Sequence, residues 1–187
     1  TFTADENQTA IGTVTASDPE NDTLTFSISG SDITIDSSSG VIAFASAPDY
    51  ETQNSYTATV TVTDGSLTAT QSITVNVNDV NDAPSGIGAS YSLNLMPQSQ
   101  TSGTLTLAGT DEDGDTLTYS IVSNGSYGTA SLSGATVTYQ TAADTQSAQT
   151  DSFTFKVNDG TVDSSAATIT ISLKTDPLYQ YQWHLNN

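Results

Sequence analysis

Acidic side chains gather in short clusters along this chain, and each cluster lies in a turn between segments that alternate like β-strands. In DVNDAP (79–84), two aspartates and an asparagine fall within four positions. A plain turn needs only one or two such residues, and neighbouring carboxylates repel each other. Ca²⁺ binds about six to eight oxygen ligands, mostly from carboxylates, amides and carbonyls. The pattern therefore predicts that calcium is the missing partner of these clusters. The clusters in the first half are Glu6; Asp18, Glu20 and Asp22; Asp49 and Glu51; Asp64; and Asp79 with Asp82.

Single fragments of this pattern have simpler interpretations. The Asp-Gly pairs at 64–65 and 159–160 are, on their own, typical of hairpin turns. DEDGD (111–115) begins like an EF-hand loop, but Thr116 and Val122 stand where that loop needs Gly and Glu. A zinc site of usual composition is excluded, since the chain has one His and no Cys. The calcium prediction therefore depends on the combination of clusters and their order.

The charge balance excludes several classes of partner. The chain has 2 Lys and Arg against 21 Asp and Glu, which gives a formal net charge of -19. Nucleic acids and anionic lipids are both bound through basic groups, so we expect neither as a partner. No apolar run approaches the ~18 residues of a membrane span, so we expect no membrane insertion in this segment. One His without a nucleophile motif around it also indicates that the segment is not an enzyme.

The elements that carry the acidic turns repeat once along the chain. ASDPENDTLTFSI (16–28) and GTDEDGDTLTYSI (109–121) are identical at seven of thirteen positions, and TVTVTDG (59–65) corresponds to TFKVNDG (154–160). Apolar residues alternate with Thr and Ser in these segments, which is typical of antiparallel strands with one buried face. We therefore predict an all-β fold of two tandem Greek-key β-sandwiches. The predicted domains are residues 1–84 and 85–175, followed by a linker at 176–187.

The order of the acidic motifs in residues 1–84 resembles that of a cadherin repeat. The motifs that carry the resemblance are Glu6-Asn7, Asp18-Pro-Glu20, Asp49-Tyr-Glu51, Thr63-Asp64-Gly65 and Asp79-Val-Asn81-Asp82-Ala-Pro84. In that family, calcium ions lie between successive repeats. The resemblance implies that one calcium shell spans both domains and fixes the angle between them.

The resemblance also implies a set of metal ligands. From the first repeat and the linker they are Glu6, Asp49, Glu51, Asp79, Asp82 and the carbonyl group of Val80. Asn81 is expected to face the second repeat, where Asp111, Asp113 and Asp159 complete the shell. Asp18, Glu20 and Asp64 form a weaker half-site in the first repeat, whose donor would lie upstream of this segment.

The second repeat departs from the cadherin pattern. It has no Glu-Asn on its first strand and no Asp-x-Glu, and its end, KTDPLYQ, lacks the calcium linker. The stretch from Gly128 through Tyr139 and Asp151 to Gly160 is similar to the cadherin-like and Ig-like repeats of large bacterial surface proteins. We therefore expect this repeat to receive calcium at one end and to build no calcium site at the other.

The last twelve residues, DPLYQYQWHLNN (176–187), resemble the start of subtilisin/kexin-type serine protease domains. This resemblance implies a peptidase domain downstream. The alternative is an apolar terminal strand or linker that packs Tyr179, Tyr181 and Trp183 on the sandwich.

Together the resemblances imply a spacer or adhesion arm of a secreted or surface-attached bacterial protein, stiffened by Ca²⁺ at the junction between its domains. Such an arm is extracellular, and another cell-surface protein is a candidate partner. Two alternatives stay open. One is a calcium-dependent module that binds polysaccharide; the other is a non-catalytic arm or pro-region of a secreted subtilisin-like serine protease.

Overall fold

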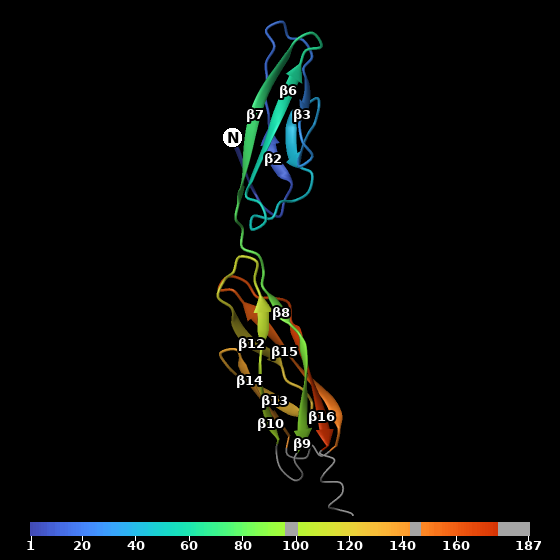
Figure 1. Cartoon of the computed structure of the whole chain (residues 1–187), viewed down its shortest axis with the longest axis vertical. Coiled ribbons are helices and arrows are strands. Elements are labelled where there is room, and N and C mark those ends of the chain that lie inside the picture. Colours follow the sequence, from blue (N-terminus) through green and yellow to red (C-terminus); the bar gives the residue numbers. More distant parts are fainter. Residues whose placement is uncertain (96–100, 143–146, 176–187) are drawn as a thin grey trace, which may run out of the picture. The chain divides into compact units, whose positions relative to one another are not determined.

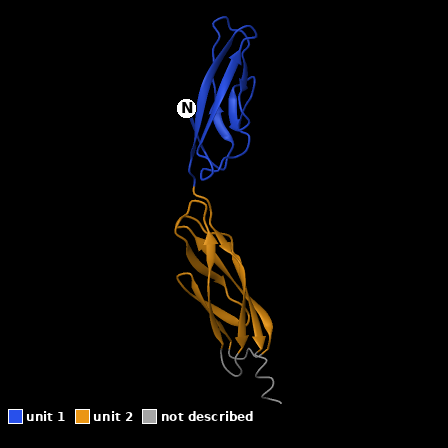
Figure 2. Ribbon diagram, in the orientation of Figure 1, with its two compact units in different colours: residues 1–80 blue, residues 81–187 orange. Residues whose placement is uncertain are grey.

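The computed structural model describes residues 1–95, 101–142 and 147–175, and all regular elements in these ranges are β-strands (Figure 1). The chain divides into two compact units, unit 1 at residues 1–80 and unit 2 at residues 81–187 (Figure 2). The division lies inside DVNDAP, so that Asn81 and Asp82 group with unit 2. No helix in the described ranges has the length and apolar character to cross a membrane. The predicted linker at 176–187 lies outside the described residues.

Unit 1 is a sandwich of two sheets. The larger sheet has the order β1-β7-β6-β3, in which β1 runs parallel to β7 and the other neighbours are antiparallel. The smaller, antiparallel sheet has the order β2-β5-β4. The strands are β1 (Phe2–Asp5), β2 (Ala10–Thr13), β3 (Thr25–Ile28), β4 (Ile33–Ile35), β5 (Val41–Phe44), β6 (Ser55–Thr63) and β7 (Thr68–Asn78).

Period-two alternation places the apolar side chains of unit 1 between its sheets. In β6, Ala58 and Val60 are buried, while the alternating Thr57 and Thr59 lie on the opposite face, where Thr57 pairs with Thr74 of β7. Threonine suits this position because its branched side chain fits a pleated surface and its hydroxyl stays in water. The buried core consists of Ala4, Phe26, Ile33, Ile42, Phe44, Ala58, Val60, Ile73, Val75 and Val77.

Unit 2 repeats this plan of two facing sheets. Its larger sheet has the order β12-β15-β16-β9, with β9 parallel to β16, and it faces a sheet of order β10-β14-β13. A short antiparallel pair joins β8 and β11. The strands are β8 (Ser85–Ile87), β9 (Ala89–Leu95), β10 (Ser102–Thr106), β11 (Ala108–Thr110), β12 (Thr118–Ser123), β13 (Gly128–Ser133), β14 (Thr136–Thr141), β15 (Gln149–Asn158) and β16 (Ala167–Thr175).

The core of unit 2 is richer in aromatic side chains. Phe153 and Phe155 of β15 are fully buried, and the ring of Tyr139 stacks on Phe153 with ring centroids 6.4 Å apart. The other buried members are Leu95, Leu105, Leu107, Ala130, Val137, Val157, Ile169, Ile171 and Leu173. The predicted all-β fold of two tandem sandwiches is confirmed.

Strand register defines the two ends of each unit. The linker end of unit 1 is where β1 and β7 finish and β6 starts, at Asp5, Asn78 and Ser55. Its far end is where β6 meets the start of β7, at Thr63 and Thr68. The linker end of unit 2 is where β15 finishes beside the start of β12, and its far end is where β9 and β16 finish.

Candidate metal sites

Glu6 is the centre of the acidic cluster at the linker end of unit 1. It directly follows β1, and only 2% of its surface is exposed. Its Oε2 accepts a hydrogen bond from the amide of Tyr50 at 2.7 Å, and its Oε1 accepts one from the amide of Val80 at 2.8 Å. The carboxylate therefore ties the end of β1 to the loop before β6 and to the chain that leaves β7.

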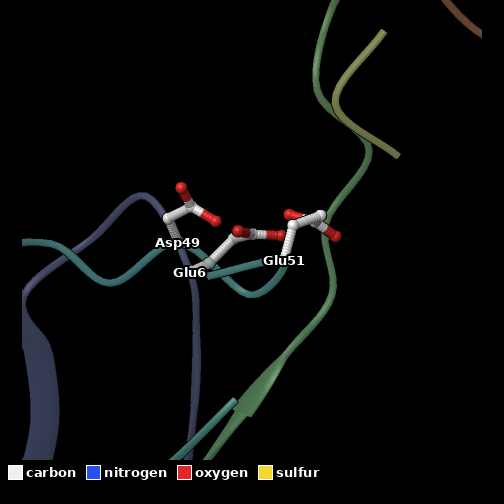
Figure 3. Close-up of side chains that lie close together, drawn as sticks. All are labelled: Glu6, Asp49 and Glu51. Carbon is white, nitrogen blue, oxygen red and sulfur yellow. The ribbon is translucent and has the colours of Figure 1, made fainter. Parts of the chain in front are cut away.

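Asp49 and Glu51 lie beside Glu6 on the loop before β6. Figure 3 shows the Glu6 carboxylate between the other two, and one ligand oxygen from each lies within 4.8 Å of the rest. The turn is shaped by Asp49 itself, whose two oxygens accept bonds from the amide and the hydroxyl of Thr52, both at 2.9 Å. In the sequence, Glu6 lies more than forty residues before Asp49 and Glu51, and the β1–β7 and β6–β7 pairings bring the three together.

This cluster has no basic side chain to balance it, because residues 1–80 contain no Lys, Arg or His. Three carboxylates at such a distance repel each other, and a buried charge without a counter-charge is costly. An all-oxygen donor set suits a hard divalent cation, and Ca²⁺ in particular. The residues present thus fit a bound calcium ion.

The linker residues extend from this cluster along the chain. Asp79 and Val80 are exposed at the end of unit 1, and the backbone N–H of Val80 donates a hydrogen bond to Glu6 Oε1. Asn81 and Asp82 are held by unit 2: Asn81 Nδ2 donates to Asp159 Oδ2 at 2.9 Å, and the amide of Asp82 donates to Asp113 Oδ2 at 2.8 Å. Asn81 therefore lies on the second-repeat side of the junction.

The linker end of unit 2 holds a second acidic cluster, Asp111, Asp113 and Asp159, but within the described residues these three carboxylates do not form a set close enough to share one ion. Asp111 and Asp113 lie in the loop between β11 and β12, and Asp159 follows β15 with 8% of its surface exposed. Asp159 Oδ1 accepts bonds from the amides of Thr161 and Val162 at 2.6 and 2.7 Å. The hydrogen bond from Asn81 Nδ2, followed by that from the Val162 amide, holds the pKa of Asp159 below its ordinary value, so this carboxylate is ionised at neutral pH.

Two carboxylate oxygens in this cluster lack hydrogen-bond partners among the described residues. Oδ1 of Asp111 accepts a bond from the amide of Asp115, but its Oδ2 is buried and accepts none from the described part of the chain. The same holds for Oδ1 of Asp113, whose other oxygen accepts from Asp82. Buried oxygens of charged groups are rarely left unsatisfied. These two are what a cation would coordinate.

The predicted half-site at the far end of unit 1 has a similar local structure. Asp18 Oδ1 accepts bonds from the amides of Glu20 and Asp22, and Asp64 Oδ1 accepts from the amides of Ser66 and Leu67. The Leu67 amide, followed by that of Ser66, holds the pKa of Asp64 below its ordinary value. Within the described residues, Asp18, Glu20 and Asp64 do not form a set of three carboxylates close enough to share an ion.

Asp151 is a buried carboxylate that the acidic motifs of the sequence did not indicate. It occupies an inward position of β15, in phase with Phe153 and Phe155. The signal in the sequence is that phase: a charged residue stands where the alternation requires an apolar one. Its partners are neutral groups of unit 2 and not other carboxylates.

Comparison with known proteins gives consistent matches over both units. Residues 81–175 match the family model described as bacterial cadherin-like domain, and residues 1–78 match that of the cadherin domain. The chain is 36% identical to protocadherin-11 X-linked from Sus scrofa over 137 residues, which is 63% of this chain and 12% of that protein. It is 34% identical to chitinase A from Pseudoalteromonas piscicida over 108 residues, 56% of this chain and 13% of that protein. The chain thus spans a small part of these relatives.

A solved structure gives the same fold. The crystal structure of human protocadherin-24 EC1-2 (form II) matches with a TM-score of 0.63 and 20% identity, covering 94% of this chain and 93% of that one. The similarity at this identity concerns the fold of two tandem repeats.

Proposed function

This chain belongs to the bacterial cadherin-like family, and from that premise we propose that it is a calcium-binding tandem module that serves as a spacer or adhesion arm of an extracellular bacterial protein. Cadherin domains generally bind Ca²⁺ and mediate contacts between proteins, they are generally non-catalytic, and cadherin ectodomains are extracellular. The proposal therefore concerns this chain's own calcium ligands and its mechanical role.

One observation carries the proposal. Glu6 is a buried carboxylate with one oxygen within 4.8 Å of an oxygen from each of Asp49 and Glu51, in a unit that contains no basic side chain. A bound cation would offset this charge, and Ca²⁺ matches the donor set. Asp79 and the carbonyl of Val80 follow directly along the chain and would supply further oxygens.

The second cluster supports the same function. Asp111 and Asp113 each present a buried oxygen that accepts no hydrogen bond from the described residues, and at the same end of the unit the hydrogen bond from Asn81 keeps Asp159 ionised. Asp82 is tied to Asp113 through its amide, which fixes its backbone beside this cluster. We assign Asp111, Asp113, Asp159, Asn81 and Asp82 as the contribution of unit 2.

We further propose that both clusters serve a shared group of calcium ions. Chain connectivity supports this. The amide of Val80 donates a hydrogen bond to Glu6 in unit 1, and the side chain of the next residue, Asn81, donates one to Asp159 in unit 2. Consecutive Cα atoms are about 3.8 Å apart, so both anchor points fall on one short segment. A shell completed by both units would hold them at a fixed angle, which is what a spacer requires. Asp18, Glu20 and Asp64 would accept the same kind of junction from a preceding repeat.

Isothermal titration of the chain with CaCl₂ and with MgCl₂ tests metal binding. We expect calcium dissociation constants of about 10⁻⁴–10⁻³ M, as in other extracellular modules, and much weaker binding of Mg²⁺, which prefers a rigid octahedral shell. Small-angle scattering in calcium and in EDTA tests the shared junction, and we expect a longer maximum dimension in calcium. Absence of calcium heat would refute the binding function. Calcium heat without any change in dimension would refute only the shared junction.

A second role is favoured by the similarity to part of chitinase A, a bacterial enzyme. In such a protein, a tandem module of this kind would be a non-catalytic arm that spaces a catalytic domain from the cell or from its substrate. This role is compatible with calcium binding and includes the protease-linked arm suggested by residues 176–187. Binding of the isolated module to polysaccharide stays a separate hypothesis, and a pull-down with insoluble chitin in calcium and in EDTA would test it.

A further inference from the structure

The carboxylate of Asp151 is buried near the far end of unit 2. This side chain is 6% exposed, and both of its oxygens accept hydrogen bonds from neutral donors. Oδ1 accepts from the amide of Ser126 at 2.9 Å, while Oδ2 accepts from the amide of Tyr127 at 2.9 Å and from the hydroxyl of Tyr139 at 2.5 Å. The carboxylate therefore fixes the loop between β12 and β13 against the start of β15.

The loop is built to approach this carboxylate closely. A Cβ atom on Gly125 would overlap the carboxylate of Asp151, and one on Gly128 would overlap the hydroxyl of Tyr139. Any side chain at these positions would collide with the hydrogen-bonded groups. Asn124 closes the loop from the other side, because its Oδ1 accepts a bond from the amide of Ala130 at 2.6 Å.

Tyr139 is a rigid donor to the carboxylate. It is 1% exposed and stacks on Phe153. Burial, followed by the hydrogen bond to Asp151, raises the pKa of the Tyr139 hydroxyl, so it stays protonated and donates at all physiological pH values.

Each unit contains a buried carboxylate, Glu6 in unit 1 and Asp151 in unit 2, and the two have different surroundings. At the linker end of unit 1, Glu6 has two amide donors but lies beside Asp49 and Glu51. Asp151 has three donors, and among the described residues it belongs to no set of three acidic or metal-ligating side chains. Alignment of TVTVTDG (59–65) with TFKVNDG (154–160) places Asp151 opposite Tyr56, which makes an apolar edge-to-face contact with Phe44.

We propose that Asp151 and Tyr139 form a lock that holds the loop between β12 and β13 against the start of β15 without a bound metal ion, so that this part of unit 2 does not depend on calcium. The neutral donors of the lock do the work that a cation does elsewhere, because they satisfy every oxygen of an isolated carboxylate. The contrast with unit 1 rests on the proposed calcium function, whereas the lock itself does not.

Amide hydrogen exchange of the whole chain, followed by NMR in calcium and in EDTA, tests this proposal. Three amides report on it: Ser126 and Tyr127 on the lock, and Val80 on the Glu6 cluster. We expect EDTA to change the rates at Ser126 and Tyr127 by less than about twofold and to raise that at Val80 at least about tenfold, since local openings differ in free energy between regions. Asp151→Asn should raise both lock rates at least about tenfold in calcium and in EDTA alike.

Two further variants complete the experiment. Tyr139→Phe keeps the stacked ring and removes only the hydroxyl, so it should raise the lock rates even if Asp151→Asn does not fold. Asp163→Asn removes an equal charge from an exposed pair with Lys156 and should leave them unchanged. The proposal is overturned if EDTA opens the lock amides as much as Val80, or if neither lock variant changes them. If EDTA leaves all three amides protected, the lock stands and calcium binding at Glu6 is refuted.

Discussion

Replacing Glu6 with glutamine tests the calcium site with little change in shape. Glutamine keeps one oxygen acceptor and replaces the other with an NH₂ group, which cannot accept from the amide of Tyr50 or Val80. The buried amide left without a partner should cost about 1–3 kcal/mol in EDTA. Loss of one charge beside Asp49 and Glu51 relieves some repulsion and works in the opposite direction.

The calcium increment separates these effects from metal binding. At a calcium concentration of ~100 times Kd, one site stabilises the folded chain by roughly 2.7 kcal/mol. In a unit of this size, that corresponds to an increase in Tm of about 11–22 °C. If Glu6→Gln weakens Kd tenfold, the same calcium concentration supplies only about 1.4 kcal/mol. We therefore expect the calcium-induced rise in Tm to fall by about half.

Differential scanning calorimetry of the wild type and the variant, each in calcium and in EDTA, measures this increment. Asp36→Asn is the matched control: it also removes one charge from unit 1, but Asp36 caps the β4–β5 turn by accepting bonds from Ser38 and Ser39. The control should show the full wild-type increment. Equal increments in Glu6→Gln and wild type would refute the assignment of Glu6 as a calcium ligand.

Three other outcomes follow from the described contacts. In unit 2, Asp113→Asn should weaken calcium binding about tenfold or more by titration calorimetry, whereas Asp163→Asn, in a surface ion pair worth at most about 1 kcal/mol, should not. Gly125→Ala should destabilise unit 2 by about 1–3 kcal/mol in urea, because its Cβ meets Asp151, while Gly134→Asn, at φ +60° in open space, should be nearly neutral. Burial alone would raise the pKa of Asp151, but bonds from Tyr139, Tyr127 and Ser126 outweigh it and hold the pKa below its ordinary value. The stability that this depressed pKa contributes is present above the pKa of the unfolded chain, about 3.9, and is lost as the pH falls through the pKa of the folded chain. The wild type should therefore lose stability below about pH 4, and Asp151→Asn should lose less.

The fold was predictable because apolar and polar residues alternate within the long strands. Val60 and Val62 in β6, and Phe153 and Phe155 in β15, alternate with polar residues over a length that is typical of a half-buried strand. The parallel pairing of β1 with β7 has no such local signal. It depends on which strands meet across the whole unit, and neighbouring residues in the sequence do not encode it.

The candidate site was predictable only in part. Residue type and order indicated the acidic clusters around Glu6 and Asp111, because carboxylates gathered in turns repel each other and need a counter-charge. The amides of Tyr50 and Val80 that hold Glu6 could not be predicted, since almost any residue supplies a backbone N–H. Asp151 was missed for a different reason: its partners come from a loop and from a tyrosine on another sheet, and neither is near it in the sequence.

In each unit the last strand pairs in parallel with an early one, β7 with β1 and β16 with β9, and this has a consequence for tension along the chain. A pulling force transmitted through β1 and β7 acts along the strands. Their hydrogen bonds are therefore loaded in shear and must break together, not one after another. The shared register covers four residue pairs between β1 and β7 and seven between β9 and β16. Under equal force, unit 1 should therefore unfold before unit 2. A metal ion bound at Glu6 would have its greatest mechanical effect there, because Glu6 directly follows the shorter β1–β7 pairing.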